Sequence, residues 1–269
     1  MKTSRLIIVA GMLLSAAGVA GWQNASRAQR ERALREAILD ELQPVALKNC
    51  TFKRYGSKND GGYLMCANLT RGVESAYSYG IDREDNWGCD VSRELAVPVH
   101  QYDCFTEHRP ACPGVKFTFH DECVGARKGT VKGQPFDTIP NQIAKNGDSG
   151  KQILLKIDVE GAEWDSLMAT PDAVLDRIVQ MPMELHGTDE QRFLDTLRKL
   201  KRTFYVVNLH YNNWACSAAV APLLATAYQV LLVNKRVGVL DPSVRPPAPS
   251  SPLNAPDNPR QPECRPPAP

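Results

Sequence analysis

Four carboxylates in eight residues follow the apolar run QILL, within the stretch KIDVEGAEWDSL at residues 156–167. If QILLKI is a buried strand, Asp158 stands at its carboxyl tip, ahead of a helix that AEWDSLMA predicts. Glu163 and Asp165 fall in the first turn of that helix, where the helix dipole favours negative charge. Asp158 and Glu160 lack such a structural explanation. We therefore predict that this pair binds a cation or a ligand amine, or takes a hydroxyl proton, at the mouth of a pocket.

Two later apolar runs also end in side chains suited to proton transfer or metal binding. The run IVQMPMEL leads to His186, and FYVVNLHY contains His210 close to its end. If both runs are strands parallel to QILLKI, their carboxyl ends meet at the same edge of the sheet. The polar residues that would then converge are Asp158, Glu160, Glu184, His186, His210, Asn212 and Asn213.

This set of side chains supports two kinds of chemistry. Imidazole and carboxylate groups can hold a divalent metal ion, and a histidine can act as a base on an acceptor hydroxyl. A lone histidine at a strand end is usually only hydrogen-bonded, whereas several polar groups at one edge favour a site. We assign no metal ligand and leave a divalent metal open. The predicted catalytic residues are Asp158, Glu160, His186 and His210.

Two earlier strand ends carry the pattern of a nucleoside site. The run SAYSYG ends at Gly80, where the backbone can turn close to a ligand, and a polar loop then leads to a helix beginning near Asp90 or Ser92. Asp103 follows about 20 residues after Gly80, where a carboxylate takes ribose hydroxyls in Rossmann-like folds. The loop lacks a G-x-G-x-G pattern, so an ordinary strand-helix loop is the alternative. The spacing of Gly80 and Asp103 favours a nucleoside cofactor.

Seven apolar or β-branched runs predict the strands that must position these residues. They cover residues 75–80, 97–105, 115–120, 152–159, 178–185, 204–211 and 228–235. Most are separated by helical patterns, namely DVSRELA, FDTIPNQIAKNG, AEWDSLMATPDAVLDRI and TDEQRFLDTLRKLKR. The alternation predicts an α/β, Rossmann-like fold with a mostly parallel seven-stranded sheet and helices on both faces. The short last connection predicts a reversed strand at one edge.

The two ends of the chain differ from this central part. Residues 1–22 begin with basic residues and continue as an uncharged apolar run, typical of a signal peptide or a signal-anchor. Residues 23–45 have helical spacing and alternating charges, which predicts a helical stem. Residues 46–240 form the predicted domain. Residues 241–269 are rich in proline and poor in large apolar residues, so we expect a disordered tail.

The cysteines and the balance of charges indicate in which compartment the protein lies and which class of partner it does not bind. A secretory segment would place the eight cysteines in an oxidising lumen, and no paired C-x-x-C zinc pattern is present. We therefore expect two or three disulfides, with Cys264 left free in the tail, in a protein that is membrane-anchored and lumen-facing or secreted. The 32 basic and 30 acidic residues nearly cancel, and the basic ones are scattered. Nucleic acid is therefore not an expected partner.

Taken together, these motifs resemble those of the FkbM-related S-adenosylmethionine-dependent methyltransferases, most closely their secretory branch. In chain order the motifs are RYGSKNDGGYLMC, AYSYGI with WGCDVS, VPVHQYDCF, FHDECVG, KIDVEGAEWDSL, ELHG and HYNN. KIDVEGAEW is by itself a fairly specific signature of that family. The resemblance leaves out the N-terminal segment, the stem and the tail.

The resemblance implies a class I methyltransferase fold with S-adenosylmethionine as the methyl donor. Asp103 would be the ribose acid, Val124 would lie on the adenine side, and Asp158 with Glu160 would lie beside the methyl-transfer site. The glycine-rich loop of the family is degenerate here, as YGIDREDNWG. The cofactor-binding residues carried over by the resemblance are Tyr79, Gly80, Asp82, Asp103, Val124 and Asp158.

The predicted function is methyl transfer to an oxygen or nitrogen of an unidentified acceptor, in the secretory pathway or outside the cell. One alternative is a membrane-anchored luminal glycosyltransferase, in which the acidic pair of the DVE sequence binds a metal ion and a nucleotide sugar. The other is a non-catalytic domain that keeps the fold without the cofactor. The spacing of Gly80 and Asp103 favours methyl transfer over both.

Overall fold

The structure is a computed structural model that describes residues 27–249 and 251–266. The predicted signal segment, residues 1–22, lies outside the described residues. Within the part that is described, no helix combines the length and the apolar character needed to cross a bilayer.

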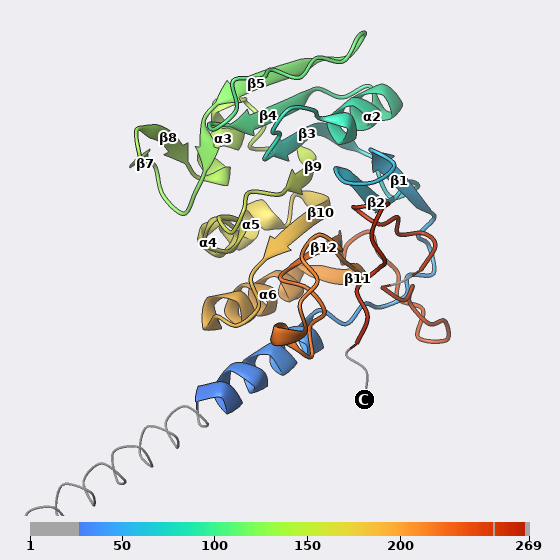
Figure 1. Ribbon diagram of the computed structural model, residues 1–269. Coiled ribbons are helices and arrows are strands. Elements are labelled where there is room, and N and C mark those ends of the chain that lie inside the picture. The colour runs from blue at the N-terminus through green and yellow to red at the C-terminus, as the bar shows by residue number, and fades with distance from the viewer. Residues whose placement is uncertain (1–26, 250, 267–269) are drawn as a thin grey trace, which may run out of the picture.

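The centre of the fold is a seven-stranded sheet, and all seven runs predicted as strands are strands in it (Figure 1). In chain order these strands are β3 (Val73–Tyr79), β4 (Val99–Asp103), β5 (Phe117–Asp121), β9 (Gln152–Ile157), β10 (Ile178–His186), β11 (Phe204–Tyr211) and β12 (Ala227–Asn234). In space their order is β11-β12-β10-β9-β3-β4-β5. All neighbouring pairs are parallel except those of β12, which is antiparallel to both β10 and β11.

The reversed strand is therefore not at the edge, as the sequence suggested, but second from it. Every residue of β12 is buried, and an entirely buried strand needs hydrogen-bonding partners on both sides. The short connection from β11 returns the chain into the gap between β11 and β10, where β12 pairs with both. The edge position belongs to β11.

Helices cover one face of the sheet. They are α3 (Ile139–Lys145), α4 (Glu163–Ala169), α5 (Asp172–Leu175) and α6 (Gln191–Thr203). Their apolar side chains, among them Trp164 and Leu200, share one core cluster with alternate residues of the strands. This alternation follows from the period of two in a β-strand. A short 3-10 helix, η1 (Ala218–Val220), lies in the connection between β11 and β12.

The other face is covered by a hairpin and one helix. The hairpin strands β1 (Phe52–Gly56) and β2 (Gly62–Cys66) pair antiparallel, and α2 (Asn86–Leu95) packs beside them. α2 begins earlier than predicted, because Asp85 caps it by accepting a hydrogen bond from the Gly88 N–H at 2.8 Å. A small sheet that the sequence did not predict, of β6 (Cys123–Val124), β7 (Gly129–Val131) and β8 (Gln134–Asp137), precedes α3.

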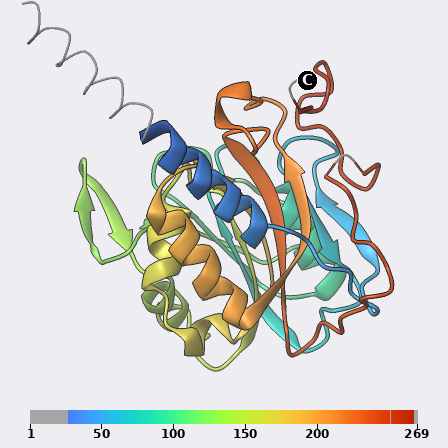
Figure 2. The same ribbon diagram turned by 90° about the horizontal axis from the view of Figure 1, so that it is seen from below.

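The described part of the predicted stem is a helix over residues 27–41, and it packs onto the domain. Ile38 and Leu42 are fully buried in the core cluster of the helical face. Glu41 accepts hydrogen bonds from Arg198 and Lys201 of α6, and Figure 2 shows the two helices side by side. The folded unit therefore begins before residue 46, because this helix has an apolar stripe that only the domain can cover.

The Pro-rich tail also differs from the expected disorder. Asn254, Asp257 and Asn258 are 6%, 2% and 5% exposed, and the Asn59 amide donates to the Pro256 carbonyl at 2.7 Å. In Figure 1 the tail runs between the hairpin and β11. The prediction inferred disorder from the low apolar content of this segment. The segment is instead held by paired polar side chains and a disulfide, which do not require an apolar core.

Four disulfides join all eight cysteines, one or two more than expected. The pairs are Cys50–Cys66, Cys89–Cys112, Cys104–Cys123 and Cys216–Cys264. Cys264, expected to be free, links the tail to the loop that follows β11. Four disulfides fit an oxidising compartment, secreted or luminal.

Candidate functional site

The tips of the two central strands, β3 and β9, touch each other through their backbones. The Asp158 N–H donates to the Tyr79 carbonyl at 3.1 Å. Gly80 has a φ of +75°, and a Cβ at this position would lie 1.6 Å from the Asp158 carbonyl oxygen. Glycine is therefore required at residue 80 both for its φ and for this close approach.

Asp158 lies at the β9 tip, as predicted, with a carboxylate that is one-quarter exposed. The Tyr63 hydroxyl of the hairpin donates to its Oδ2 at 2.8 Å, and the Lys156 ammonium lies 3.7 Å from the same oxygen. Lys156 also donates to the Tyr79 and Gly80 carbonyls, which ties the two strand tips together. The hairpin and the strand before the tip thus orient Asp158 between a hydroxyl and an ammonium group.

His186 stands at the tip of β10 and is held from behind by Glu163. The fully buried Glu163 carboxylate accepts the His186 backbone N–H at 2.7 Å and lies 3.3 Å from Nδ1 of the ring. It also accepts the Gly161 N–H at 2.8 Å. The sequence assigned Glu163 only a helix-start role, whereas the structure makes it the residue that positions His186.

The other ring nitrogen of His186 faces two more carboxylates. Nε2 lies 3.5 Å from Glu160 Oε2 and 3.7 Å from Glu184 Oε1. The Glu160 side chain is 87% exposed, and its backbone has a φ of +52°, which is uncommon for a residue other than glycine. Glu184 is buried and accepts the Asn212 amide at 2.7 Å. Potential ligand atoms of Asp158, Glu160 and His186 lie within 4.8 Å of one another.

Burial and neighbouring charges shift the pKa values in this group. Burial of Glu184, reinforced by the negative charges of Asp158 and Asp257, raises its pKa. Burial alone would lower the pKa of His186, but the hydrogen bond and charge of Glu163, with Glu184 and Asp158, outweigh it and raise that pKa. The site therefore favours positive charge on His186 and opposes further negative charge.

Both carboxylate oxygens of Asp103, the predicted ribose acid, accept hydrogen bonds from backbone N–H groups. Its Oδ2 accepts the Ile81 and Asp82 N–H groups at 2.9 and 3.1 Å. Its Oδ1 accepts the Phe105 and Thr106 N–H groups at 2.8 and 3.3 Å. Since a carboxylate has about four acceptor sites, this set fills its capacity. In the structure Asp103 fixes the loop after β3, in which Asp82 has a φ of +50°.

Tyr79 and Val124 occupy different environments. The Tyr79 side chain is fully buried and stacks on the Tyr102 ring, 5.1 Å between centroids, so only its backbone reaches the strand tips. Val124 lines a cavity of about 280 Å³ between the small sheet and the start of α4. The cavity is mainly apolar, with Gly125, Phe136 and Ala162 among its lining residues.

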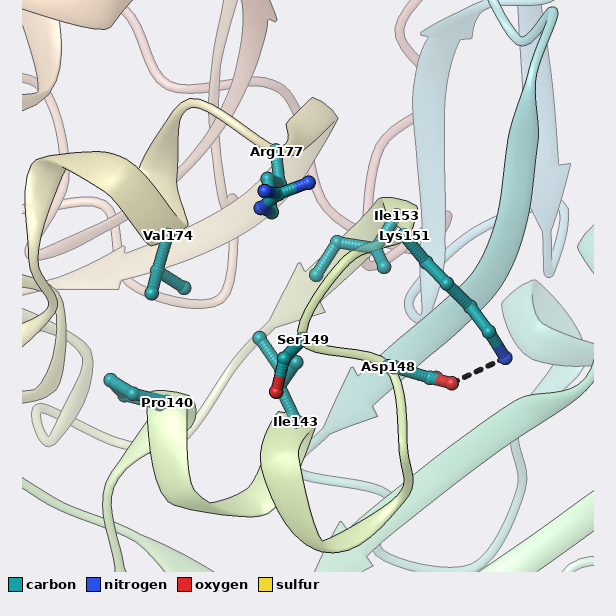
Figure 3. Close-up of a pocket in the computed structure, with 8 residues that line it drawn as sticks. All are labelled: Pro140, Ile143, Asp148, Ser149, Lys151, Ile153, Val174 and Arg177. Carbon is teal, nitrogen blue, oxygen red and sulfur yellow. Dashed lines mark ion pairs between the residues drawn. The ribbon is translucent and has the colours of Figure 1, made fainter.

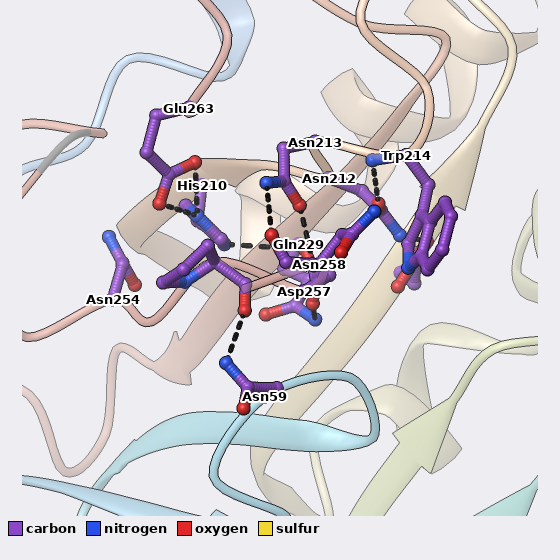
Figure 4. Close-up of polar contacts among 12 residues, drawn as sticks. Asn59, His210, Asn212, Asn213, Trp214, Gln229, Asn254, Asp257, Asn258 and Glu263 are labelled. Carbon is purple, nitrogen blue, oxygen red and sulfur yellow. Dashed lines mark hydrogen bonds and ion pairs between the residues drawn. The ribbon is translucent and has the colours of Figure 1, made fainter. Parts of the chain in front are cut away.

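His210 does not join the other predicted catalytic residues. It is 1% exposed, and its Nε2 lies 3.2 and 3.3 Å from the two carboxylate oxygens of Glu263 in the tail (Figure 4). Its Nδ1 lies 3.8 Å from Asp257 Oδ2. Burial lowers the pKa of His210. The prediction of convergence was wrong for this residue, because the tail, whose position the sequence did not reveal, covers it.

Asn213 also serves the tail. Its amide donates to the Asn258 carbonyl at 2.9 Å, and its carbonyl accepts the Asn258 N–H at 2.7 Å (Figure 4). The amide also donates to the Gln261 carbonyl at 3.1 Å. Asn212 alone of this pair reaches the candidate site, through Glu184.

A second cavity, of about 50 Å³, lies where β9 begins, at the opposite end of that strand from Asp158 (Figure 3). The ion pair of Lys151 with Asp148 borders it. Because this cavity is small and lies at the opposite end of β9, it is not part of the site at the strand tips.

No protein-family model matches the chain, and no curated protein matches it with significant similarity.

Proposed function

We propose that this chain is a class I S-adenosylmethionine-dependent methyltransferase of the FkbM-related kind. The observation that carries the proposal is the sheet. Its order β11-β12-β10-β9-β3-β4-β5, with one reversed strand between the last two parallel ones, is the arrangement expected of a class I methyltransferase. The polar residues gather at the carboxyl ends of β9 and β10, where open α/β sheets bind their ligands.

Two features of the chain suit the cofactor. The apolar cavity beside Val124 offers room for a purine ring, and it continues to Ala162 and Asp165, close to the β9 tip. Gly80 keeps the backbone of the β3 loop free of a side chain at the point where that loop meets Asp158. S-adenosylmethionine bound here would supply an electrophilic methyl group.

One feature of the chain does not suit the cofactor. Asp103 has no acceptor site left for ribose hydroxyls, because four backbone N–H groups fill its carboxylate. We therefore propose that Asp103 acts as a positioning residue that holds the Gly80 loop in shape.

The chain's own task would be to bind the acceptor, orient it and take its proton. Asp158, Glu160 and Nε2 of His186 face a common space. The two carboxylates can accept a proton from a hydroxyl or an amine, and His186 can do so only from its neutral form. Glu163 and Tyr63 would hold His186 and Asp158 in position. The four disulfides favour an acceptor that is luminal or extracellular.

A glycosyltransferase is the second candidate, since the acidic pair of the DVE sequence lies with His186 in a group that could hold a metal ion. Titration calorimetry of the disulfide-bonded chain separates the two proposals. We expect S-adenosylmethionine to bind and uridine diphosphate with Mn²⁺ to give no nucleotide-dependent heat. Binding of the nucleotide alone would replace methyl transfer by glycosyl transfer, and binding of neither ligand would favour a non-catalytic domain.

A further inference from the structure

The Glu160 and Glu184 carboxylates lie farther from Nε2 of His186 than the partners of a direct hydrogen bond. Charge-assisted hydrogen bonds between nitrogen and a carboxylate are about 2.7 to 2.9 Å long. Nε2 of His186 lies 3.5 Å from Glu160 and 3.7 Å from Glu184, and within the described chain it makes no hydrogen bond. Two ligands that each lie about 2.1 Å from one ion are about 3.4 Å apart at the tetrahedral angle.

We propose that Asp158, Glu160 and Nε2 of His186 form a binding site for a divalent transition-metal ion such as Mn²⁺ or Zn²⁺. The three ligand atoms already lie within 4.8 Å of one another. The exposed Glu160 side chain has room to turn toward an ion held by the other two. One imidazole with two carboxylates suits these borderline ions better than it suits Mg²⁺ or Ca²⁺, which prefer oxygen ligands alone.

The ring of His186 is oriented as a metal-bound histidine requires. Metal-bound histidines usually give their second ring N–H to a carboxylate or carbonyl behind them, which fixes the tautomer and the ring plane. Glu163 takes this place on Nδ1, and it also holds the His186 backbone N–H. Nε2 is thereby left facing Glu160, Glu184 and Asp158, where a bound ion would take the place of a proton on that nitrogen.

A buried carboxylate aimed into the group is the second observation that points to a cation. The Glu184 side chain is 6% exposed, with its Oε1 3.7 Å from His186 Nε2, and among the described residues its one hydrogen-bond donor is the neutral Asn212 amide. A buried carboxylate either takes up a proton or gains a positive partner. Lys156 reaches Asp158 but is shared with two backbone carbonyls, so a divalent ion beside His186 would supply the positive charge that keeps Glu184 ionised.

This site uses the same three residues that face the acceptor in the proposed function, but it can be tested without S-adenosylmethionine and without any activity. The experiment titrates Mn²⁺, and in a second arm Zn²⁺, into the tag-free, disulfide-bonded chain by calorimetry, with the Mn²⁺ arm repeated by electron paramagnetic resonance. The test variant is Glu160→Gln, because its side chain is exposed and its loss should leave the fold intact. The control is Asp165→Asn, which removes a neighbouring carboxylate that pairs with Arg192 outside the site.

We expect one ion per chain, at least tenfold weaker binding in Glu160→Gln and unchanged binding in Asp165→Asn. Thermal melts of each protein without metal show whether the variants are folded. The proposal is overturned if the wild-type chain binds neither ion, or if Glu160→Gln binds as tightly as the wild type. A bound ion together with no binding of S-adenosylmethionine would keep the metal site and reject the methyltransferase.

Discussion

Glu163 holds both the backbone N–H and Nδ1 of His186, at 2.7 and 3.3 Å, from a fully buried position at the start of α4. The contact joins the element after β9 to the tip of β10, and it fixes the direction in which the ring presents Nε2. The neighbouring Asp165 is more than half exposed and pairs with Arg192. Two carboxylates of one helix turn therefore have different roles.

Glu163→Gln should lower the free energy of unfolding by roughly 1 to 3 kcal/mol, because it removes a buried charged acceptor of three donors. Asp165→Asn is the matched control and should change it by less than about 0.5 kcal/mol, as is usual for surface substitutions. Urea denaturation of both variants measures the difference. Equal effects would mean that both residues serve only the helix dipole.

Gly80→Ala should be far more damaging than the same change at Gly147. The two glycines have φ values of +75° and +74°, but only Gly80 has a backbone atom where the new methyl group would lie. Gly147→Ala should cost roughly 1 to 2 kcal/mol from backbone strain alone. Gly80→Ala adds overpacking to that strain, for roughly 3 kcal/mol or more in total. Thermal or urea unfolding tests this, and similar costs would refute the close contact with Asp158.

Replacing Cys216 and Cys264 by serine should destabilise the docked tail. The disulfide spans 48 residues, and closing a loop of that length in the unfolded chain is worth up to about 4 kcal/mol. We expect a lower free energy of unfolding and faster tryptic cleavage after Arg260 in the double variant. Non-reducing peptide mapping of the wild type should recover the Cys216–Cys264 peptide. Cleavage at the wild-type rate in the variant would show that the tail does not depend on this bond.

Asp257 should make the tail sensitive to pH. Burial, with the charges of Asp60 and Glu263 and against that of Arg54, raises its pKa to about 7. The folded state therefore binds a proton that the unfolded state releases near pH 4, so this contribution to stability is complete below pH 4 and is lost as the pH rises toward 7. The charged or titratable groups around it are Arg54, Asp60, Glu184, His210 and Glu263.

The substitution Asp257→Asn isolates that contribution. The lowered pKa of His210 acts in the opposite direction, since its stabilising effect grows as the pH rises toward 6.5, but it is present in both proteins. Between pH 5 and pH 8 the wild-type melting temperature should fall relative to that of Asp257→Asn. Parallel melting curves over this range would contradict a buried, protonated Asp257.

The sheet could be predicted from the sequence because the signals that mark a strand lie within the strand itself and its neighbouring residues. Each strand is an apolar run, and the change from period two to helical spacing marks its end, so Asp158 could be placed at a strand tip. What could not be predicted depends on contacts between distant residues. Tyr63 lies 95 residues before the Asp158 carboxylate that it contacts, and the position of β12 depends on which neighbours can pair with it.

The tail shows the same limit most clearly. Its composition is that of a disordered segment, yet Asp257 and Asn258 are buried through pairing with Gln229 and Asn213. These polar contacts leave no periodic pattern in the sequence, so the prediction placed His210 in the open site that the tail in fact covers. A disulfide partner for Cys264 could likewise not be chosen among eight cysteines by spacing alone.

Binding of S-adenosylmethionine to the disulfide-bonded chain tests the central claim most directly. Ala126 is an exposed residue that lines the cavity beside Val124, whereas Lys128 is exposed on the same loop outside the lining. Equilibrium dialysis should show that the wild type and Lys128→Trp bind the cofactor equally. Ala126→Trp, which fills the cavity, should bind it at least tenfold more weakly. No binding by the wild type, or equal binding by Ala126→Trp, would contradict the proposed methyltransferase site.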